Sequence, residues 1–177
     1  MAKKQTNLCV AADLTIAADV LNLAKQVGPY ICCIKTHIDV IEDFHPNFVR
    51  RLQEIAEMYE FMLMEDRKFA DIGKTVQMQY SKVVFNISSW VTLVTVHSIF
   101  RKGVLDAISK VDSDRRKGVF LLAEASASGT LIDEKYTGET LKIASEYDGL
   151  IVGVVCQSPL FRDKKKTSSI NTGSSSG

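Results

Sequence analysis

Charged side chains in this sequence stand where short apolar runs end. Lys35 and His37 close one such run, and Asp66 and Lys68 follow the next, with Asp71 three residues further along. In folds built from parallel strands, the carboxyl ends of the strands lie on one face, where sites are built. A single lysine at a strand end is most simply a solvated charge. Two lysines and two aspartates at the ends of neighbouring strands instead predict a catalytic or ligand-binding cluster, in which each charge favours the ionised form of its neighbour.

Other polar residues follow the remaining apolar runs. Asp13 follows the first run, His97 the fourth, Glu124 and Ser126 the fifth, and Gln157 the sixth. No third residue with metal-ligand spacing accompanies the histidines, so we predict no metal site and interpret His97 as a structural histidine. No GxGxxG or phosphate-loop motif occurs, which argues against a nucleotide cofactor.

An alternation of apolar runs and amphipathic segments would bring this cluster together. Six runs are expected to be strands, at residues 8–12, 30–35, 61–64, 93–96, 119–123 and 150–155. Five segments between them have helical spacing, at residues 15–27, 46–59, 75–89, 104–111 and 138–147. Thr15 is expected to cap the first helix, and Gly28 to end it.

This order of elements predicts an α/β fold with parallel strands joined by right-handed helical crossovers. Two architectures fit the pattern, an open doubly wound sheet and a closed eight-stranded barrel. A closed barrel needs eight strand–helix units and usually about 250 residues. This chain has 177 residues and supplies six units.

Composition narrows the class of protein. Lys plus Arg number 22 and Asp plus Glu 21, a formal net charge of +1, which argues against binding nucleic acid through bulk electrostatics. No run approaches ~18 uncharged apolar residues and no secretory signal is recognisable, so we predict no membrane association. The four cysteines lack metal-ligand spacing and are expected to be reduced thiols of a cytoplasmic protein. Residues 162–177 are basic and then rich in Ser, Thr and Gly, which predicts a disordered tail after a single domain over residues 1–161.

One motif is specific to a known family. The sequence EDRKFADIG at residues 65–73 resembles the signature of orotidine 5′-phosphate decarboxylases, in the eukaryotic form found alone or as the second half of bifunctional UMP synthase. Three further segments resemble the same family in the same order: TNLCVAAD at 6–13, GPYICCIKTHIDVIEDF at 28–44 and LLAEASASGTL at 121–131. Together they extend the resemblance over roughly residues 3–158.

The resemblance implies a (β/α)₈ TIM barrel, here incomplete with about six units. It implies a homodimer that converts orotidine 5′-phosphate to UMP and CO₂ in pyrimidine biosynthesis, with no metal or cofactor. By resemblance, the catalytic set is Lys35, Asp66, Lys68 and Asp71. Lys68 is then the proton donor to the carbon that loses CO₂, and Asp71 reaches in from the partner subunit.

The same resemblance implies a substrate-binding set. Asp13 and His37, together with Lys35, resemble the ribose-binding positions. Ile72 and Thr75 resemble residues that the partner subunit contributes around the ligand. Ser126 resembles the serine that reads the edge of the pyrimidine.

The sequence also departs from the family pattern. Ala11 stands where the family usually has serine, and Thr95 and Val96 stand where it has asparagine and alanine, so we expect the polar chemistry at the end of the fourth strand to be lost. After Gln157 nothing resembles the last two barrel strands, which carry the family's phosphate-binding Gln and Arg with a Tyr between them. Phosphate binding far from the reacting carbon stabilises the transition state of such an enzyme, so we expect weak activity.

Two alternatives remain open from the sequence. The chain could be a catalytically impaired isoform or fragment that only pairs with a full-length subunit and lends it Asp71 and Thr75. It could also be a different barrel lyase, or a phosphosugar isomerase, built on the same Asp-x-Lys-x-x-Asp spacing.

Overall fold

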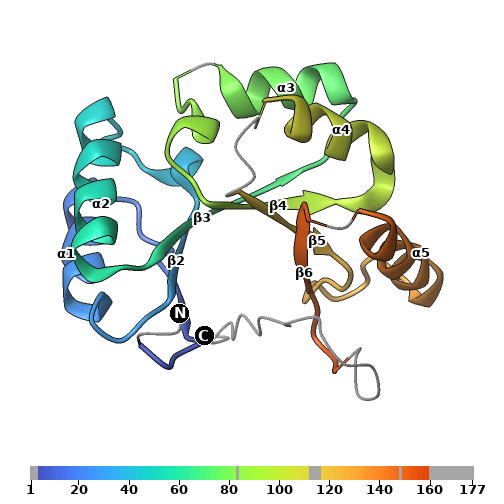
Figure 1. Cartoon of the computed structure of the whole chain (residues 1–177), viewed down its shortest axis with the longest axis horizontal. Coiled ribbons are helices and arrows are strands. Elements are labelled where there is room, and N and C mark those ends of the chain that lie inside the picture. The colour runs from blue at the N-terminus through green and yellow to red at the C-terminus, as the bar shows by residue number, and fades with distance from the viewer. Residues whose placement is uncertain (1–3, 83, 112–116, 148, 160–177) are drawn as a thin grey trace.

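Six parallel strands form one curled sheet in the computed structural model, which describes residues 4–82, 84–111, 117–147 and 149–159. The strands are β1 (Cys9–Ala11), β2 (Cys33–Thr36), β3 (Met62–Phe69), β4 (Leu93–His97), β5 (Gly118–Leu122) and β6 (Ile151–Val155). Each strand pairs in parallel with the next along the chain. Figure 1 shows the sheet as an open arc with the helices on its outer side.

Helices connect the strands and cover the convex face of the sheet. They are α1 (Ala17–Val27), α2 (Pro46–Tyr59), α3 (Gly73–Ser81), α4 (Lys102–Val111) and α5 (Glu134–Glu146). Three 3₁₀ turns accompany them: η1 (Ile38–Val40), η2 (Ile87–Ser89) and η3 (Ser98–Phe100). The expected alternation of six strands and five helices is therefore confirmed over the described residues.

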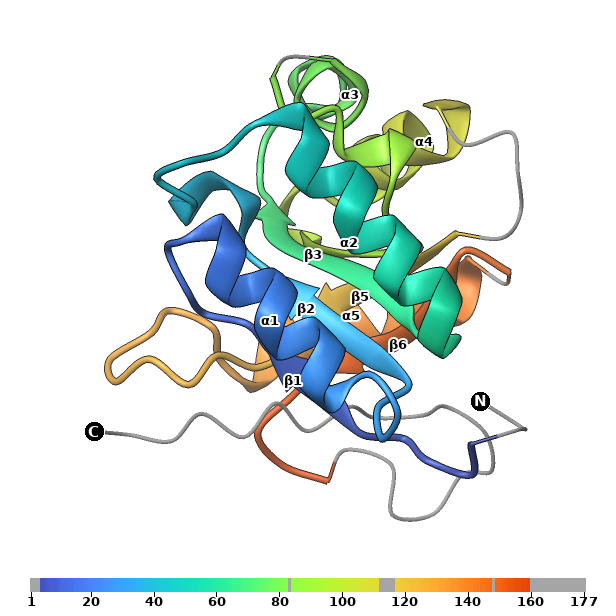
Figure 2. The ribbon, with the colours of Figure 1, turned by 90° about the vertical axis from the view of Figure 1, so that its left-hand side faces the viewer.

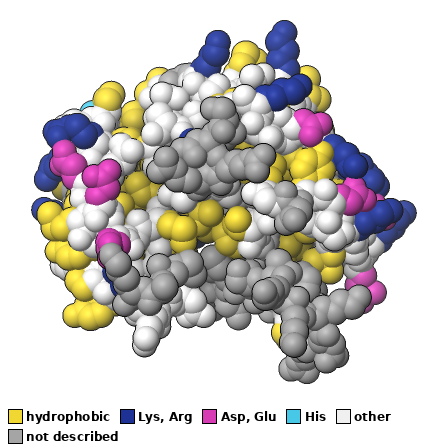
Figure 3. Space-filling view, viewed as in Figure 1, with side chains coloured by type: hydrophobic (Ala, Val, Ile, Leu, Met, Phe, Trp, Pro, Cys, Tyr) yellow, Lys and Arg dark blue, Asp and Glu magenta, His cyan; other side chains and the backbone are white. Residues whose placement is uncertain are grey.

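The core has two layers because the sheet is apolar on both faces. The larger layer lies between the strands and the helices and includes Phe48, Leu52 and Ile108. The smaller layer lies on the concave face, where Met64 of β3 packs with Phe120 of β5. In Figure 3 apolar side chains show at the centre of the arc, while the Lys and Arg side chains visible on this face stand mostly on its rim.

The N-terminus of α1 differs from the expectation from the sequence, whereas its C-terminus agrees with it. Thr15 does not cap the helix; instead the Ala17 N–H donates to Asp43 Oδ1 at 2.7 Å. Gly28 ends the helix as expected, with its N–H bonded to the Ala24 carbonyl. A Cβ at position 28 would lie 2.6 Å from a ring carbon of Tyr59, so glycine allows the close approach of α1 and α2 seen in Figure 2.

Three other elements each have a bound that lies four or more residues from the expected one. The third strand does not end at residue 64 but continues through its charged residues to Phe69. Glu65 is buried with hydrogen-bond partners, and Asp66 and Lys68 pair with each other at the mouth of the arc. The third helix ends at Ser81 rather than residue 89, and Asn86 adopts a left-handed backbone before η2. The fifth helix begins at Glu134 because Asp133 caps it by accepting from the Tyr136 N–H.

Two further expectations concern cysteines and the chain end. All four cysteines are free thiols, and three of them are buried. The predicted tail at residues 162–177 lies outside the described residues, as does the end of the predicted 1–161 domain.

Candidate active site

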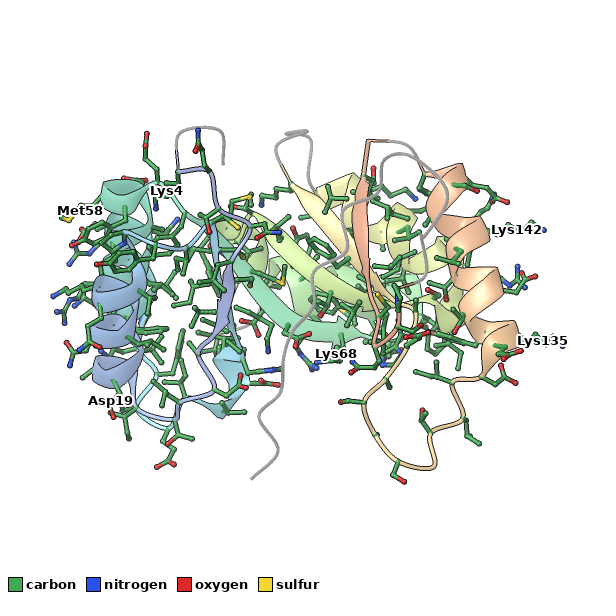
Figure 4. The ribbon with its side chains drawn as sticks, turned by 90° about the horizontal axis from the view of Figure 1, so that it is seen from below. Lys4, Asp19, Met58, Lys68, Lys135 and Lys142 are labelled. Carbon is green, nitrogen blue, oxygen red and sulfur yellow. The ribbon has the colours of Figure 1, made fainter. Side chains whose placement is uncertain are left out.

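The carboxyl ends of the strands surround a cavity of about 430 Å³. Figure 4 places Lys68 at this edge of the sheet, on the same side as the loop that precedes α5. The cavity is lined by Lys35, His37, Met64, Asp66, Lys68, Thr95, His97, Phe120, Leu122, Glu124, Ala125, Ser126, Ala127, Thr130, Ile132, Val155 and Gln157. Its wall is therefore apolar toward the inside of the arc and charged at the mouth.

An irregularity in β3 presents the charged residues. Between Glu65 and Phe69 the strand advances four residues while β4 advances two, from Val94 to Val96, so β3 carries two extra residues. Lys68 has a φ of 47°, in the left-handed region that residues other than glycine rarely adopt. Such a conformation costs about 1–2 kcal/mol and persists only where the surroundings hold it.

Asp66 lies between two lysine ammonium groups. Its Oδ2 is 2.7 Å from Lys68 Nζ and 3.0 Å from Lys35 Nζ. Lys35 comes from β2 and its side chain is 7% exposed, while the side chain of Asp66 is 10% exposed. The three groups form an alternating Lys–Asp–Lys array across two adjacent strands, as the strand-end positions predicted.

Asp13 and His37 extend this array toward β1. Lys35 Nζ lies 3.5 Å from Asp13 Oδ1 and 3.0 Å from His37 Nε2. The pKa of His37 is lowered by burial and by the charge of Lys35. A neutral His37 ring can thus accept a hydrogen bond from the Lys35 ammonium through Nε2.

The charged partners keep Asp66 ionised. Burial alone would raise its pKa, but the hydrogen bond from Lys68, the charge of Lys35 and the hydrogen bond from Thr95 outweigh burial. Together they lower the pKa of Asp66 to about 2. The carboxylate is therefore charged at any pH at which the protein would work.

Glu65 supports the array from the other face of β3. Its side chain is fully buried, where Oε2 accepts from the Thr36 hydroxyl at 2.7 Å and Oε1 accepts from the Ile38 N–H at 3.0 Å. These two bonds tie the chain on either side of His37 to β3. The sequence points to Glu65 only through its place in the EDRKFADIG motif.

Thr95 was assessed wrongly from the sequence. Its hydroxyl donates to Asp66 Oδ1 at 2.7 Å and accepts from the Lys68 N–H at 2.9 Å. The end of β4 therefore keeps polar chemistry, supplied by the Thr95 hydroxyl. Its role could have been suspected from its position, because Thr95 lies two residues before His97 on the strand that pairs with β3.

Two further lining residues are held by hydrogen bonds. The Tyr136 hydroxyl lies 3.5 Å from His97 Nδ1 and accepts from the Ser98 N–H at 2.9 Å. Glu124 accepts from the backbone N–H groups of Gln157 and Ser158, at 2.6 and 2.7 Å, which fixes the chain after β6. His97 thus has a structural partner and also faces the cavity.

The remaining predicted residues divide into two groups. Ser126 lines the cavity from the loop after β5. Asp71, Ile72 and Thr75 lie at the start of α3 and do not line this cavity. Asp71 accepts from the Ile72 N–H, and the Ile72 side chain is 60% exposed.

The part of the chain that the structure describes contains neither a metal-ligand cluster nor a membrane-spanning helix. Within the described residues no three His, Cys, Asp or Glu side chains are grouped so that they could hold a metal ion. Among the described helices, none has the length and apolar character needed to cross a membrane.

Comparison with known proteins decides the family. Residues 6–174 match the model of the orotidine 5′-phosphate decarboxylase / HUMPS family. The chain belongs to this family. It is 42% identical over 157 residues to the orotidine 5′-phosphate decarboxylase of Rhizomucor pusillus, and 40% identical over 155 residues to that of Schizosaccharomyces pombe.

The match covers most of this chain and less of its relatives. The alignment spans 89% of this chain and 60% of the Rhizomucor pusillus protein, and 88% and 59% for Schizosaccharomyces pombe. The chain thus spans about 60% of the length of the curated relatives it matches. The resemblance to the eukaryotic family members is confirmed.

Solved structures of the family share the fold. The orotidine 5′-monophosphate decarboxylase of Methanocaldococcus jannaschii superposes with a TM-score of 0.70 at 18% identity, over 84% of this chain and 69% of that one. Leishmania donovani UMP synthase superposes with a TM-score of 0.61 at 19% identity, over 87% of this chain and 37% of that one. The six described strands therefore form part of a family-type TIM barrel, and the predicted incomplete barrel is confirmed.

Proposed function

We propose that this chain carries the orotidine 5′-phosphate decarboxylase site, which converts orotidine 5′-phosphate to UMP and CO₂ in de novo pyrimidine biosynthesis. The observation that carries the proposal is the array of Lys35, Asp66 and Lys68 at the mouth of the cavity, in a chain that belongs to this family. The enzyme class is a carboxy-lyase.

The proposed reaction breaks one carbon–carbon bond. The bond from C6 of the pyrimidine to its carboxylate breaks, CO₂ leaves, and the electron pair stays on C6. The Lys68 ammonium stabilises this developing charge and then transfers a proton to C6, giving UMP. Lys68 regains its proton from water, and the proposed chemistry requires neither a metal nor a cofactor.

Asp66 has two tasks in this mechanism. Its Oδ2 contacts both lysines, so it keeps the ammonium groups charged and holds Lys68 in place. It also sets a fixed negative charge beside the position of the substrate carboxylate, which it repels. Departure of CO₂ relieves that repulsion.

The neighbouring polar groups suit the rest of the substrate. Asp13, Lys35 and His37 lie together at the β1 and β2 side of the mouth, where they can bind the hydroxyls of the ribose. Ser126 faces the same cavity from the opposite loop and can read the polar edge of the pyrimidine. The apolar wall formed by Met64 and Phe120 limits access of water to the ring.

We further propose that the working protein is a homodimer in which Asp71, Ile72 and Thr75 complete the partner's site. Their position outside their own chain's cavity supports this, as does the exposure of Ile72. Exposed Met78, Ile99 and Phe100 add apolar surface suited to such an interface. The proposed compartment is the cytoplasm, where free cysteine thiols such as these stay reduced.

The identity of the product tests this proposal. Orotidine 5′-phosphate is incubated with the protein in D₂O and followed by ¹H NMR beside a panel of sugar phosphates. We expect UMP carrying deuterium at C6, with every sugar phosphate unchanged. Turnover of a sugar phosphate without formation of UMP would instead identify a different lyase or isomerase.

A further inference from the structure

The irregular part of β3 needs a partner that the sheet does not provide. Glu65 and Phe69 are paired with Val94 and Val96 of β4, and the three residues between them face Thr95 alone. Lys68 lies in this segment with its left-handed backbone. A conformation of this kind relaxes unless neighbouring groups hold it.

The Thr95 hydroxyl supplies that missing partner. It accepts from the backbone N–H of Lys68 at 2.9 Å and donates its own proton to Asp66 Oδ1 at 2.7 Å. One hydroxyl has a single proton and two acceptor positions, so both bonds can form at once. Thr95 is 1% exposed, so water does not readily replace either bond.

These bonds set the direction of both charged side chains. With Oδ1 bound to Thr95, the Asp66 carboxylate presents Oδ2 to Lys35 and Lys68. With its N–H bound to Thr95, the Lys68 backbone is fixed at the point from which its side chain leaves the strand. The Thr95 hydroxyl therefore holds both the backbone of Lys68 and the Asp66 carboxylate that contacts the Lys68 ammonium.

We propose that Thr95 is a positioning residue, which clamps the β3 irregularity and thereby fixes Asp66 and Lys68 relative to each other. Its meaning for catalysis rests on the proposed function, but the clamp is a property of the fold and is measurable without turnover. A chain with the clamp and no decarboxylation would refute the proposed function alone.

Two substitutions separate the hydroxyl from the shape of the side chain. Thr95→Val keeps the branched shape that suits a strand and removes the hydroxyl, whereas Thr95→Ser keeps the hydroxyl. Thr92→Val is the matched control, because Thr92 lies just before β4 and its hydroxyl bonds to no described residue. Amide hydrogen exchange is measured by NMR for Lys68, with the Val94 and Val96 amides as internal references.

We expect Thr95→Val to lower the exchange protection of the Lys68 amide by about tenfold or more, while Thr95→Ser and Thr92→Val leave it nearly unchanged. The carboxyl carbon of Asp66 should also begin to titrate at higher pH in Thr95→Val only. Unchanged protection in Thr95→Val, or equal loss in Thr95→Ser, would overturn the proposal. If Thr95→Val does not fold, the unsubstituted chain still decides: a Lys68 amide that exchanges like one in a free loop would refute the clamp.

Discussion

Adjacent carboxyl groups in β3 meet opposite surroundings. Asp66 faces two ammonium groups at the cavity mouth, which lower its pKa to about 2. Glu65 points the other way into the apolar layer, where burial raises its pKa to about 8 in spite of hydrogen bonds from Thr36 and Ile38. At neutral pH one carboxyl is therefore charged and its neighbour is mainly protonated.

Glu65 should make the stability of the fold pH-dependent. Its pKa in the folded chain lies above the ordinary 4.5, so between about pH 4.5 and 8 the folded state holds a proton that the unfolded state has lost. The free energy of unfolding therefore decreases as the pH rises through this window. Glu65→Gln keeps a neutral acceptor for the Ile38 N–H but does not titrate.

We expect the free energy of unfolding, measured in urea, to fall between about pH 5.5 and 8.5. The fall should be at least about 1 kcal/mol larger for the unsubstituted chain than for Glu65→Gln. Glu42→Gln, at an exposed glutamate, is the control and should follow the unsubstituted chain. Parallel profiles for the unsubstituted chain and Glu65→Gln would show that Glu65 is charged in the folded state.

Residue types at strand ends predicted much of the candidate site. Lys35, Asp66 and Lys68 converge as expected because consecutive parallel strands bring their carboxyl ends together. Thr95 and Glu65 were not foreseen because their importance depends on register. From the sequence, a threonine in an apolar strand is expected to be a core residue. Its hydroxyl becomes important only because β3 carries two extra residues relative to β4, which places the Lys68 N–H beside Thr95.

At the scale of elements, periodicity predicted the order of strands and helices but not the contacts that end them. The first helix is an example, because Thr15 has the right type and position for a cap. The actual partner of the Ala17 N–H is Asp43, 26 residues further along the chain. A cap that comes from a distant loop leaves no local pattern in the sequence.

The Asp43 cap leads to a simple stability prediction. Asp43→Ala leaves the Ala17 N–H without its acceptor and should lower the free energy of unfolding by about 1 kcal/mol. Thr15→Ala, which removes the residue expected from the sequence, should cost less than about 0.5 kcal/mol. Chemical denaturation compares the two variants directly, and an equal cost for both would restore Thr15 as the cap.

At the scale of the whole molecule, the distribution of charge limits the expected rate. The two lysines among the described lining residues, Lys35 and Lys68, both contact Asp66, and burial lowers the pKa of the two lining histidines, His37 and His97. The 5′-phosphate of the proposed substrate therefore has no separate cation in the described part of the cavity. Binding energy remote from the reacting carbon contributes to the rate of such an enzyme.

We expect this chain alone to turn over orotidine 5′-phosphate more than tenfold slower than the Rhizomucor pusillus relative, of which it spans 60%. Both proteins are assayed under identical conditions by the loss of orotate absorbance. Turnover within tenfold of the relative would mean that this chain already binds the phosphate.

The proposed dimer can be tested by mixing two inactive variants. Lys68→Ala removes a group of the chain's own site, and Asp71→Asn removes a group proposed to serve the partner's site. A mixed dimer then carries one doubly altered site and one intact site, so the mixture should regain about a quarter of the activity of the unsubstituted chain. A mixture no more active than its components would place Asp71 in its own chain's site or outside any site.

Release of labelled CO₂ shows whether the array around Lys68 performs decarboxylation. Orotidine 5′-phosphate labelled in its carboxylate is incubated with the unsubstituted chain, with Lys68→Ala and with Lys25→Ala, an exposed lysine of α1 as the control. We expect the unsubstituted chain and Lys25→Ala to release CO₂ at equal rates, well above the rate in buffer. Lys68→Ala should still bind the nucleotide but release CO₂ at least about a hundredfold more slowly. Release by Lys68→Ala at more than a few per cent of the rate of the unsubstituted chain, on the order of 2 kcal/mol of lost stabilisation, would show that Lys68 is not the proton donor.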